Sequence, residues 1–450
     1  MIDKKLYIQT IGCQMNVYDS RQIESLLGQS GYRRIDTPDR ADLIIVNTCA
    51  IRDKAEQKLY SLLGRLAPIK HRRPDTILAV GGCVAQQEGT ALLSRVPGLD
   101  MVFGTHALAR VPALVARVAS TRARIVDVGM LSPEGEGSSA LVDAGHEEIS
   151  RFVTIMRGCD NFCTYCVVPY VRGRETSRPP DEIITEIRDL VAAGVREVTL
   201  LGQNVNSYGN KEGLISFAEL LAQVDAIAGL ARIRFTTSHP KDLSDALIDA
   251  FAGLKKLCPH IHLPVQSGAN TVLRRMHRRY TREIYIDRVA RLREKCPDIA
   301  VTSDIIAGFP GETEADFQMT LDLIETIRFD GLFAFKYSDR PNARARDYPD
   351  KVPEAEKSRR LQALFAVQEG ITLSKNRALE GTRQIVLVEG VSRHSPAGAV
   401  QWTGRAPGNQ IVNFSIPGTT AADRQQWVGR EVAVGIEKGL LHSLLGNALL

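Results

Sequence analysis

The sequence predicts an α/β protein in three parts: a doubly wound parallel α/β domain, a full or partial (β/α) barrel, and a small antiparallel β-barrel. Three observations lead to this prediction. Apolar, β-rich runs alternate with helical patterns over the first 130 residues, and again from Arg151 to about Tyr337. Beyond residue 381, short β-rich runs follow one another without helices between them. The chain has 450 residues, and at roughly 100–200 residues per domain this length allows about three domains.

The N-terminal region predicts the doubly wound sheet. It contains three apolar runs, each followed by a helical pattern: LYIQTIG from Leu6, DLIIVNT from Asp42 and TILAVGG from Thr76. Strands that alternate with helices favour a parallel sheet. The stretch from Ser132 to Glu148 is rich in Gly, Ser and Glu, which is typical of a linker. We therefore expect a first domain at 1–131 and a linker at 132–150.

The central region predicts the barrel. Its six strand candidates are FVTIM (Phe152–Met156), EVTLL (Glu197–Leu201), RIRFTTS (Arg232–Ser238), HIHLPV (His260–Val265), AVTSDIIAG (Ala300–Gly308) and GLFAFKY (Gly331–Tyr337). Amphipathic helices lie between most of them, such as Asp181–Gly194, where Gly194 is the expected C-cap. Chemistry in a β/α barrel lies at the C-terminal ends of the strands. A last helix, about Glu354 to Arg377, ends a domain expected at 151–378.

The C-terminal region predicts the small barrel, at 379–445. Its β-rich runs are QIVLVEGVS, AVQWTG, QIVNFSI and EVAVGIE, with Gly and Pro between them. Trp402, Arg405 and Phe414 lie on these expected strands. Aromatic and basic side chains together can stack on bases and contact an RNA backbone. The alternative for Trp402 and Phe414 is packing in the core of the barrel.

Composition excludes several classes of protein. Hydrophobic residues make up 44% and charged residues 24% of the chain, which rules out a disordered, collagen-like or disulfide-scaffold protein. No run approaches the roughly 18 apolar residues of a membrane span, and the N-terminus lacks a signal-peptide pattern. We therefore expect a cytoplasmic protein with no membrane partner. The net charge of +5 permits a nucleic-acid partner without requiring one.

The strongest chemical signal is the run Cys159-Asp-Asn-Phe-Cys163-Thr-Tyr-Cys166, which follows the first barrel strand. Three thiolates at this spacing can bind three of the four irons of a cubane and leave the fourth open to a ligand. Structural zinc prefers four protein ligands, so three favours a catalytic iron–sulfur cluster. The alternative is a loop of cysteines that holds no metal.

A second cysteine triad is spread along the chain. Cys13, Cys49 and Cys83 each follow one of the three N-terminal strands. The C-terminal ends of parallel strands meet at one edge of a sheet, so these thiolates are expected to converge on a second cluster. The alternative is that each is a small buried hydrophobe. Cys258 and Cys296 each precede a proline and are assigned to packing.

Polar residues at other strand ends are candidates for cofactor contacts. Gln203, Ser238, Gln266 and Ser267 follow the second to fourth barrel strands, and Gly308 opens GFPGE after the fifth. Each alone is also an ordinary loop residue. Basic residues form further groups, for which a solvated face is the alternative to phosphate binding. These groups are Arg172, Arg174 and Arg178; Arg274, Arg275, Arg278, Arg279 and Arg282; and Arg340, Arg344 and Arg346.

With RGCDNFCTYCVVPYVRGRE and the three N-terminal cysteines, the chain resembles the methylthiotransferase family of radical S-adenosylmethionine (SAM) enzymes over its whole length. The resemblance implies an N-terminal cluster domain, a radical SAM core and a C-terminal TRAM domain that binds RNA. Within the family, NTCAIRDKAEQK (Asn47–Lys58) is similar to the branch that acts on dimethylallyladenosine in tRNA. Two other branches, one acting on an aspartate of a ribosomal protein and one on threonylcarbamoyladenosine, differ after NTC.

The resemblance also implies a chemistry. Two [4Fe-4S] clusters and SAM would place a methylthio group on carbon 2 of the adenosine at position 37 of tRNA. The unreactive C–H bond there requires a 5′-deoxyadenosyl radical, and a second SAM methylates the sulfur held at the Cys13, Cys49 and Cys83 cluster. SAM contacts are expected from Tyr165, Gln203, Ser238, Gln266, Ser267 and Gly308. RNA contacts are expected from Arg172, Arg174, Arg178, Arg340, Arg344, Trp402 and Arg405.

The implied partners are the anticodon stem-loop of tRNA and an electron donor such as flavodoxin, and we expect a monomer. Three other functions remain open at this point. They are the same chemistry on a ribosomal-protein aspartate or another tRNA adenosine, a non-catalytic RNA-binding protein with structural metal sites, and an electron-transfer protein. A carrier of electrons normally closes all four iron positions, which disfavours the last.

Overall fold

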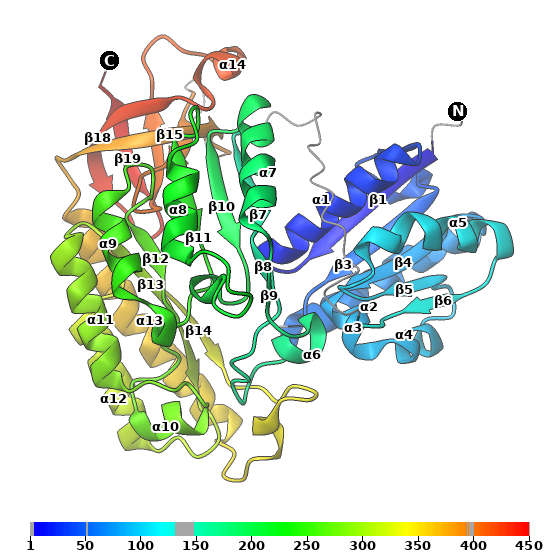
Figure 1. The fold of residues 1–450 in the computed structure, drawn as a ribbon, viewed down its shortest axis with the longest axis horizontal. Coiled ribbons are helices and arrows are strands. Elements are labelled where there is room, and N and C mark those ends of the chain that lie inside the picture. Colours follow the sequence, from blue (N-terminus) through cyan, green and yellow to red (C-terminus); the bar gives the residue numbers. More distant parts are fainter. Residues whose placement is uncertain (1–3, 51–52, 131–147, 394, 396–399, 450) are drawn as a thin grey trace.

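The three-part architecture is confirmed by a computed structural model that describes residues 4–50, 53–130, 148–393, 395 and 400–449 (Figure 1). The expected linker falls mainly on residues 131–147, outside the described residues. Within the described part of the chain, no helix is long and apolar enough to cross a membrane.

The N-terminal part is a six-stranded, all-parallel sheet in the order β2-β1-β3-β4-β5-β6. The three predicted strands are β1 (Lys4–Ile11), β3 (Leu43–Thr48) and β4 (Ile77–Gly82), and they are neighbours at the centre. Sequence reading missed the three-residue strands β2 (Tyr32–Arg34), β5 (Met101–Phe103) and β6 (Ile125–Asp127). Runs this short carry almost no periodicity, so neighbouring strands and helices have to define them.

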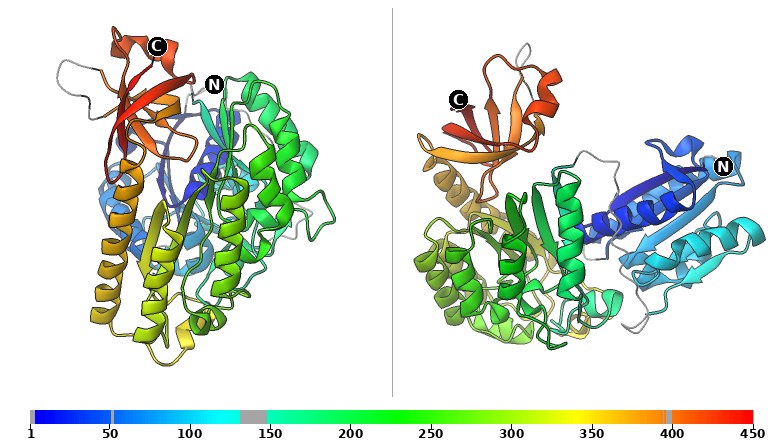
Figure 2. Two further views of the ribbon diagram at one scale, coloured as in Figure 1. Left: turned by 90° about the vertical axis from the view of Figure 1, so that its left-hand side faces the viewer. Right: turned by 45° about the horizontal axis from the view of Figure 1, so that its top comes forward.

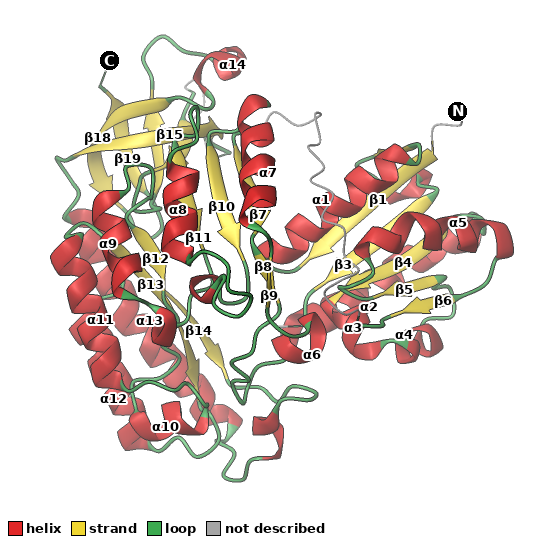
Figure 3. Ribbon diagram, viewed as in Figure 1, coloured by secondary structure: helices red, strands yellow, loops and turns green. Residues whose placement is uncertain are grey.

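Helices cover both faces of this sheet, as a doubly wound fold requires (Figures 1 and 3). Apolar residues of α1 (Gln14–Gln29) and α5 (Val111–Thr121) form one core with the sheet. Those of α2 (Asp53–Arg72), α3 (Cys83–Glu88) and α4 (Thr90–Arg95) form the other. The central strands β3 and β4 are buried along their whole length because both of their faces are covered.

The central part is a barrel of six parallel strands in chain order. The strands are β7 (Ser150–Thr154), β10 (Glu197–Leu201), β11 (Arg232–Phe235), β12 (His260–His262), β13 (Ala300–Ala307) and β14 (Gly331–Lys336). Hydrogen bonding divides them into two sheets, β7-β10-β11 and β12-β13-β14, which a bridge between Ile233 and Leu257 joins. Within the described residues β7 and β14 do not pair with each other, so the partial barrel is the correct form.

Helices surround the barrel, and the N-terminal part closes its open side. The larger helices are α7 (Pro180–Ala192), α8 (Phe217–Asp225), α9 (Asp245–Gly253), α11 (Arg282–Lys295), α12 (Glu314–Ile327) and α13 (Glu354–Arg377). The first turns of helix α1 pack against the free edge of β7, while the rest of the helix covers the N-terminal sheet (Figures 1 and 2). Met15 and Tyr18 of α1 are buried there against Leu201 of β10. The first strand of the barrel is therefore shielded by a helix of another domain.

The C-terminal part is a closed five-stranded barrel, β15-β16-β17-β19-β18. Its strands are β15 (Arg383–Val391), β16 (Trp402–Arg405), β17 (Ile411–Ser415), β18 (Glu431–Gly439) and β19 (Leu444–Ala448). The sequence predicted the first four. It is not purely antiparallel, because β17 and β19 pair in parallel to close the barrel.

This small barrel docks on the end of the central barrel where the strands begin, opposite the ends where the chemistry is expected (Figure 1). Arg232, the first residue of β11, donates to Glu431 Oε1 at 2.9 Å and to the carbonyl oxygens of Arg405 and Ile385. Arg234 donates to the carbonyl oxygens of Ala406 and Pro407. The small barrel therefore lies away from the C-terminal strand ends that form the barrel mouth.

Candidate functional site

The three N-terminal cysteines lie together at the C-terminal edge of the sheet. Ile11 pairs with Thr48, and Thr48 pairs with Gly82, so the ends of β1, β3 and β4 are in register. Cys49 and Cys83 follow these paired residues directly, and Cys13 follows Ile11 by two positions, at the N-cap of α1. The strand order places neighbouring ends side by side, which is why residues more than thirty positions apart converge.

Buried amides fix the backbone around this triad. Asn16 Nδ2 donates to Asn47 Oδ1 at 3.2 Å and to the carbonyl oxygen of Thr48 at 2.9 Å. Asn47 Nδ2 donates back to the carbonyl oxygen of Asn16 at 2.9 Å. Gly82 has φ +90°, and a Cβ there would come within 2.4 Å of the Thr48 carbonyl oxygen. The sequence did not indicate these asparagines, because their roles depend on partners from a neighbouring strand.

The thiols of this triad have unequal acidities. A hydrogen bond with Cys49 lowers the pKa of Cys13 to about 6, against the opposing effect of burial, and the charge of Arg172 lowers this pKa further. Burial raises the pKa of Cys83, and Arg172 partly offsets that rise. Cys13 therefore ionises easily, whereas Cys83 depends on a nearby positive charge to become a thiolate.

The other triad lies on a loop at the C-terminal end of β7, as predicted. The loop starts at Gly158, leads into α6 (Val168–Arg172), and is flanked by the antiparallel pair β8 (Met156–Arg157) and β9 (Thr176–Ser177). Gly158 has φ +73°, and a Cβ there would lie 2.0 Å from the Arg174 carbonyl oxygen. Only glycine fits this start of the loop. Gln203 holds the loop to the next strand end by accepting from Gly158 N at 2.6 Å.

A buried arginine supports the thiols of this loop from the far side of the barrel. Arg278 Nη1 lies 3.5 Å from Cys163 Sγ and 3.3 Å from the hydroxyl oxygen of Tyr165. Arg278 Nη2 donates to the carbonyl oxygen of Pro264 at 2.6 Å. Arg278 belongs to a basic group for which the sequence left phosphate binding and a solvated face open, yet it is 4% exposed. Its charge lies beside the cysteines and not in solvent.

The donor set of each triad fits a [4Fe-4S] cluster. Burial raises the pKa of Cys159 to about 11 and that of Cys166 to about 12. Metal binding releases such protons, because the thiolate is the ligand. Within the described residues, no group of three or more His, Cys, Asp or Glu side chains has the geometry to hold a metal ion. The thiolates that hold a cubane do not have to meet at one ion, because each binds a different iron, whereas the ligands of a zinc ion must all surround the same atom.

Helix α6 connects the two triads. It starts two residues after Cys166, whose Sγ lies 3.4 Å from Val168 N. Its other end packs beside Cys83, since Val171 and Cys83 lie in one apolar cluster, and the charge of Arg172 acts on Cys83 and Cys13. Five residues at about 1.5 Å each make a helix only about 8 Å long. The two triads therefore lie close together, at the interface of the first two domains.

Unpartnered polar atoms cluster at the barrel mouth. Four buried side-chain atoms at the strand ends have no hydrogen-bond partner among the residues that the structure describes: Asn204 Oδ1, Ser238 Oγ, His239 Nε2 and Gln266 Oε1. His239 Nδ1 accepts from Lys241 N at 3.3 Å, which leaves the proton on Nε2. Burial lowers the pKa of His239 well below its usual range, so the ring is neutral. Buried polar atoms without partners are costly, and here they are arranged as they would be for a polar ligand.

The other predicted SAM contacts differ in what the structure offers. Ser267 is fully buried and accepts from Ala269 N at 3.2 Å, so its hydroxyl serves the local turn. Gly308 has φ +73°, and a Cβ there would meet Lys357 of α13 at 2.2 Å. Tyr165 is half-buried, in contact with Arg278. Asn204 and His239, which are not among the predicted SAM contacts, are better placed than Ser267 because each has a buried polar atom without a partner among the described residues.

Three of the expected RNA contacts are inside the protein. Trp402 is fully buried in the core of the small barrel and donates from Nε1 to Thr419 Oγ1 at 2.9 Å, so the packing alternative is correct. Arg172 forms a buried ion pair with Asp19, and Arg178, whose side chain is 13% exposed, forms a largely buried one with Glu186. Of the remaining expected contacts, Arg405 is half-buried against Glu389.

The other three predicted arginines remain accessible. Arg174 is exposed in a pair with Asp160, Arg340 is half-buried, and Arg344 is exposed. Arg340 and Arg344 belong to the segment that follows β14, at the mouth end of the barrel. They are the predicted basic residues that an RNA at the mouth could reach.

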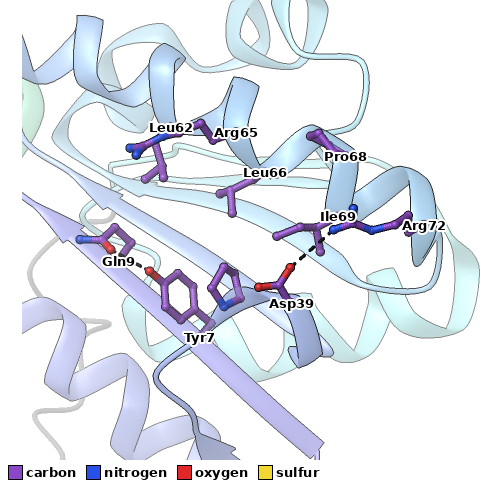
Figure 4. Close-up of a pocket in the computed structure, with 10 residues that line it drawn as sticks. Tyr7, Gln9, Asp39, Leu62, Arg65, Leu66, Pro68, Ile69 and Arg72 are labelled. Carbon is purple, nitrogen blue, oxygen red and sulfur yellow. Dashed lines mark hydrogen bonds and ion pairs between the residues drawn. The ribbon is translucent and has the colours of Figure 1, made fainter.

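One further hollow lies outside this site. A cavity of about 370 Å³ opens between β1 and the second half of α2, with Tyr7, Asp39, Arg65 and Arg72 among its lining residues (Figure 4). No cysteine lines it. Its charged groups, including the Asp39–Arg72 ion pair, are exposed side chains.

Comparison with known proteins agrees with this division of the chain. Residues 153–324 match the Radical SAM superfamily, and residues 5–104 match the Uncharacterized protein family UPF0004. Three curated relatives carry the name tRNA-2-methylthio-N(6)-dimethylallyladenosine synthase. The protein of Desulfosudis oleivorans is 57% identical over 99% of this chain and 97% of its own. Those of Syntrophus aciditrophicus (100% and 95%) and Geobacter sulfurreducens (99% and 97%) are 51% and 52% identical.

Solved structures show the same fold at low identity. TsrM of Kitasatospora setae, a radical S-adenosylmethionine methyltransferase, has a TM-score of 0.56 and 14% identity, over 77% of this chain and 74% of its own. The cobalamin-dependent radical enzyme OxsB has a TM-score of 0.52 and 14% identity, over 82% of this chain and 56% of its own. At these identities the likeness shows the fold alone.

Proposed function

The chain belongs to the family of tRNA-2-methylthio-N(6)-dimethylallyladenosine synthases, and on that premise we propose how its residues carry out the reaction. It is a radical SAM methylthiotransferase that acts on N6-dimethylallyladenosine in tRNA. Its cofactors are [4Fe-4S] clusters and SAM. The proposal assigns one cluster to each cysteine triad, with the target at carbon 2 of the adenosine at position 37.

The observation that carries this assignment is the presence of two three-cysteine sites at the two ends of one short helix. Cys159, Cys163 and Cys166 are the proposed ligands at the barrel mouth, and Cys13, Cys49 and Cys83 those at the sheet edge. When bound, the clusters supply one-electron cleavage of SAM at the first site and the sulfur for transfer at the second. Three protein ligands leave one iron of each cluster open to SAM or sulfur.

The protein's own groups bind and orient the reactants. His239 Nε2–H offers one assured donor, Asn204 Oδ1 and Gln266 Oε1 offer two acceptors, and the Ser238 hydroxyl can donate or accept. We assign them to the polar edges of SAM and of the adenine, while Tyr165 orients the SAM adenine. Thr237 and Gln266 have φ +72° and +75°, a strained conformation for residues other than glycine. Such strain is typical of sites where backbone is held for a ligand.

The substrate base has to leave its stack to reach the mouth, which suits an anticodon loop. Arg340, Arg344 and Arg174 are the proposed phosphate contacts there. Since the small barrel docks at the opposite end of the central barrel, it is assigned to RNA outside the loop that carries the target base. We further propose that the protein works as a cytoplasmic monomer and takes electrons from a donor such as flavodoxin.

Separable cysteine variants test the assignment. Cys163→Ala should abolish SAM cleavage, because the first cluster is lost. Cys49→Ala should leave cleavage intact and block methylthiolation, because only the sulfur site is damaged. Mass spectrometry of tRNA nucleosides reads the product, with Cys296→Ala as the matched control that changes neither. A Cys49→Ala enzyme that still forms methylthiolated tRNA would refute the assignment of the second triad. Unchanged methylthioadenosine in a strain that lacks the gene would point to the ribosomal-protein substrate.

A further inference from the structure

Arg172 lies where the two cysteine triads meet. It stands in a basic stretch of the sequence, yet its side chain is only 5% exposed. It is the last residue of α6, the helix that the first cysteine loop leads into. Burying the charge of an arginine is costly unless the charge is paired, so the groups around the guanidinium indicate its role.

Helix α6 follows the first triad in the sequence, but its side chains pack against residues of the second triad's domain. Val171 of α6 is buried in the core cluster that contains Cys83 and Val84 of α3. Thr105 Oγ1 donates to the carbonyl oxygen of Val171 at 2.6 Å. Helix α6, which follows the loop that holds Cys159, Cys163 and Cys166, therefore ends within the domain that holds the other triad.

The guanidinium of Arg172 faces one carboxylate and two of the three thiols of the second triad. Its Nη2 donates to Asp19 Oδ2 at 2.7 Å. Asp19 is on α1, the helix whose N-cap is Cys13. Its Oδ1 is buried without a hydrogen-bond partner, so the pair uses one oxygen only. The charge of the same guanidinium lowers the pKa values of Cys83 and Cys13, against the effect of burial.

We propose that Arg172 is a positioning residue that the first cysteine loop supplies to the second triad, where its buried charge offsets the thiolates and raises the reduction potential of the loaded site. This inference rests on the proposed function, in which the second triad holds a [4Fe-4S] cluster. Three thiolates bring three negative charges into a buried site. A buried cation beside the cluster is weakly screened and favours the reduced, more negative state.

Replacing Arg172 and replacing Asp19 should shift the midpoint potential of the second cluster in opposite directions. A purely structural role for the pair would not predict opposite shifts. Arg172→Gln removes the positive charge and should shift the midpoint potential of the second cluster to a more negative value. Asp19→Asn removes the negative charge beside Arg172 and should shift it to a more positive value. Arg172→Lys keeps the charge and should stay near the parent. Arg178→Gln is the matched control: Arg178 is also paired and largely buried, with Glu186 in place of Asp19, and its replacement should leave the potential unchanged.

The measurement is a redox titration followed by electron paramagnetic resonance on the full chain, with Cys159, Cys163 and Cys166 changed to alanine so that only the second site loads. Thermal unfolding of each variant establishes that it is folded. Equal potentials for Arg172→Gln, Asp19→Asn and the parent, or shifts of both in one direction, overturn the inference while the proposed function stands. An Arg172→Lys shift as large as that of Arg172→Gln also overturns it. A parent that binds no iron at this site refutes the proposed function itself.

Discussion

Replacing Gly158 by alanine should remove the first cluster and spare the second. Gly158 begins the loop that carries Cys159, Cys163 and Cys166, and its amide donates to Gln203. At φ +73°, an added Cβ would lie 2.0 Å from the Arg174 carbonyl oxygen and 2.6 Å from that of Gly173. Both contacts are with backbone, so no side chain can rotate to relieve them. The loop or the β8–β9 pair has to move.

The magnitude follows from two contributions. A left-handed conformation costs an alanine roughly 1–2 kcal/mol, and forcing an extra methyl group into closely packed structure costs about 1–3 kcal/mol more. The total of about 2–5 kcal/mol is below the usual 5–15 kcal/mol stability of a domain. The chain should therefore fold, while the loop moves away from the position that brings its three thiols together.

Iron analysis after anaerobic reconstitution measures the outcome. The parent should hold about eight irons per chain, as two cubanes, and the Gly158→Ala protein about four, with no SAM cleavage. Gly213→Ala is the matched control, because Gly213 has φ +68° with nothing within 4 Å of its Cβ position. It should lose about 1–2 kcal/mol of stability and no iron. Full iron and normal SAM cleavage in Gly158→Ala would show that this reasoning about the loop is wrong.

Two further predictions concern the ends of the molecule away from the clusters. Trp402→Ala should destabilise the C-terminal barrel by about 3–5 kcal/mol, because it removes a fully buried ring and leaves Thr419 without its indole donor, and urea unfolding should show a lower first midpoint. A variant that loses RNA affinity with unchanged stability would contradict the core role. Burial lowers the pKa of His260 to about 3, from a usual 6.5, so the unfolded state binds a proton that the folded state rejects. Stability should then be highest above pH 6.5 and fall toward pH 3 by at most about 1.4 kcal/mol per pH unit. His260→Gln should reduce that slope in denaturant titrations, and an unchanged slope would refute the assignment.

The sequence by itself determined the features that local spacing encodes. The Cys159–Cys166 motif, the strand EVTLL and the helix from Glu354 to Arg377 depend on neighbours a few positions away, and all appear where they were expected. Convergence of the second triad was also predictable, because repeated strand–helix units place successive strand ends on one edge of a sheet. That argument needs only the order of the units and no side-chain contacts.

Only the tertiary structure decided which charged and aromatic residues are buried, and against what. Arg172 pairs with Asp19, 153 positions away in the sequence, and Arg232 pairs with Glu431, 199 positions away. Trp402 became a core residue because five strands close around it. The end of the central barrel on which the small barrel docks is also decided by distant contacts, because Arg232 and Arg234 at the start of β11 make them. Burial and ion pairing arise from contacts between distant segments, and residue type and local spacing carry no information about the partner.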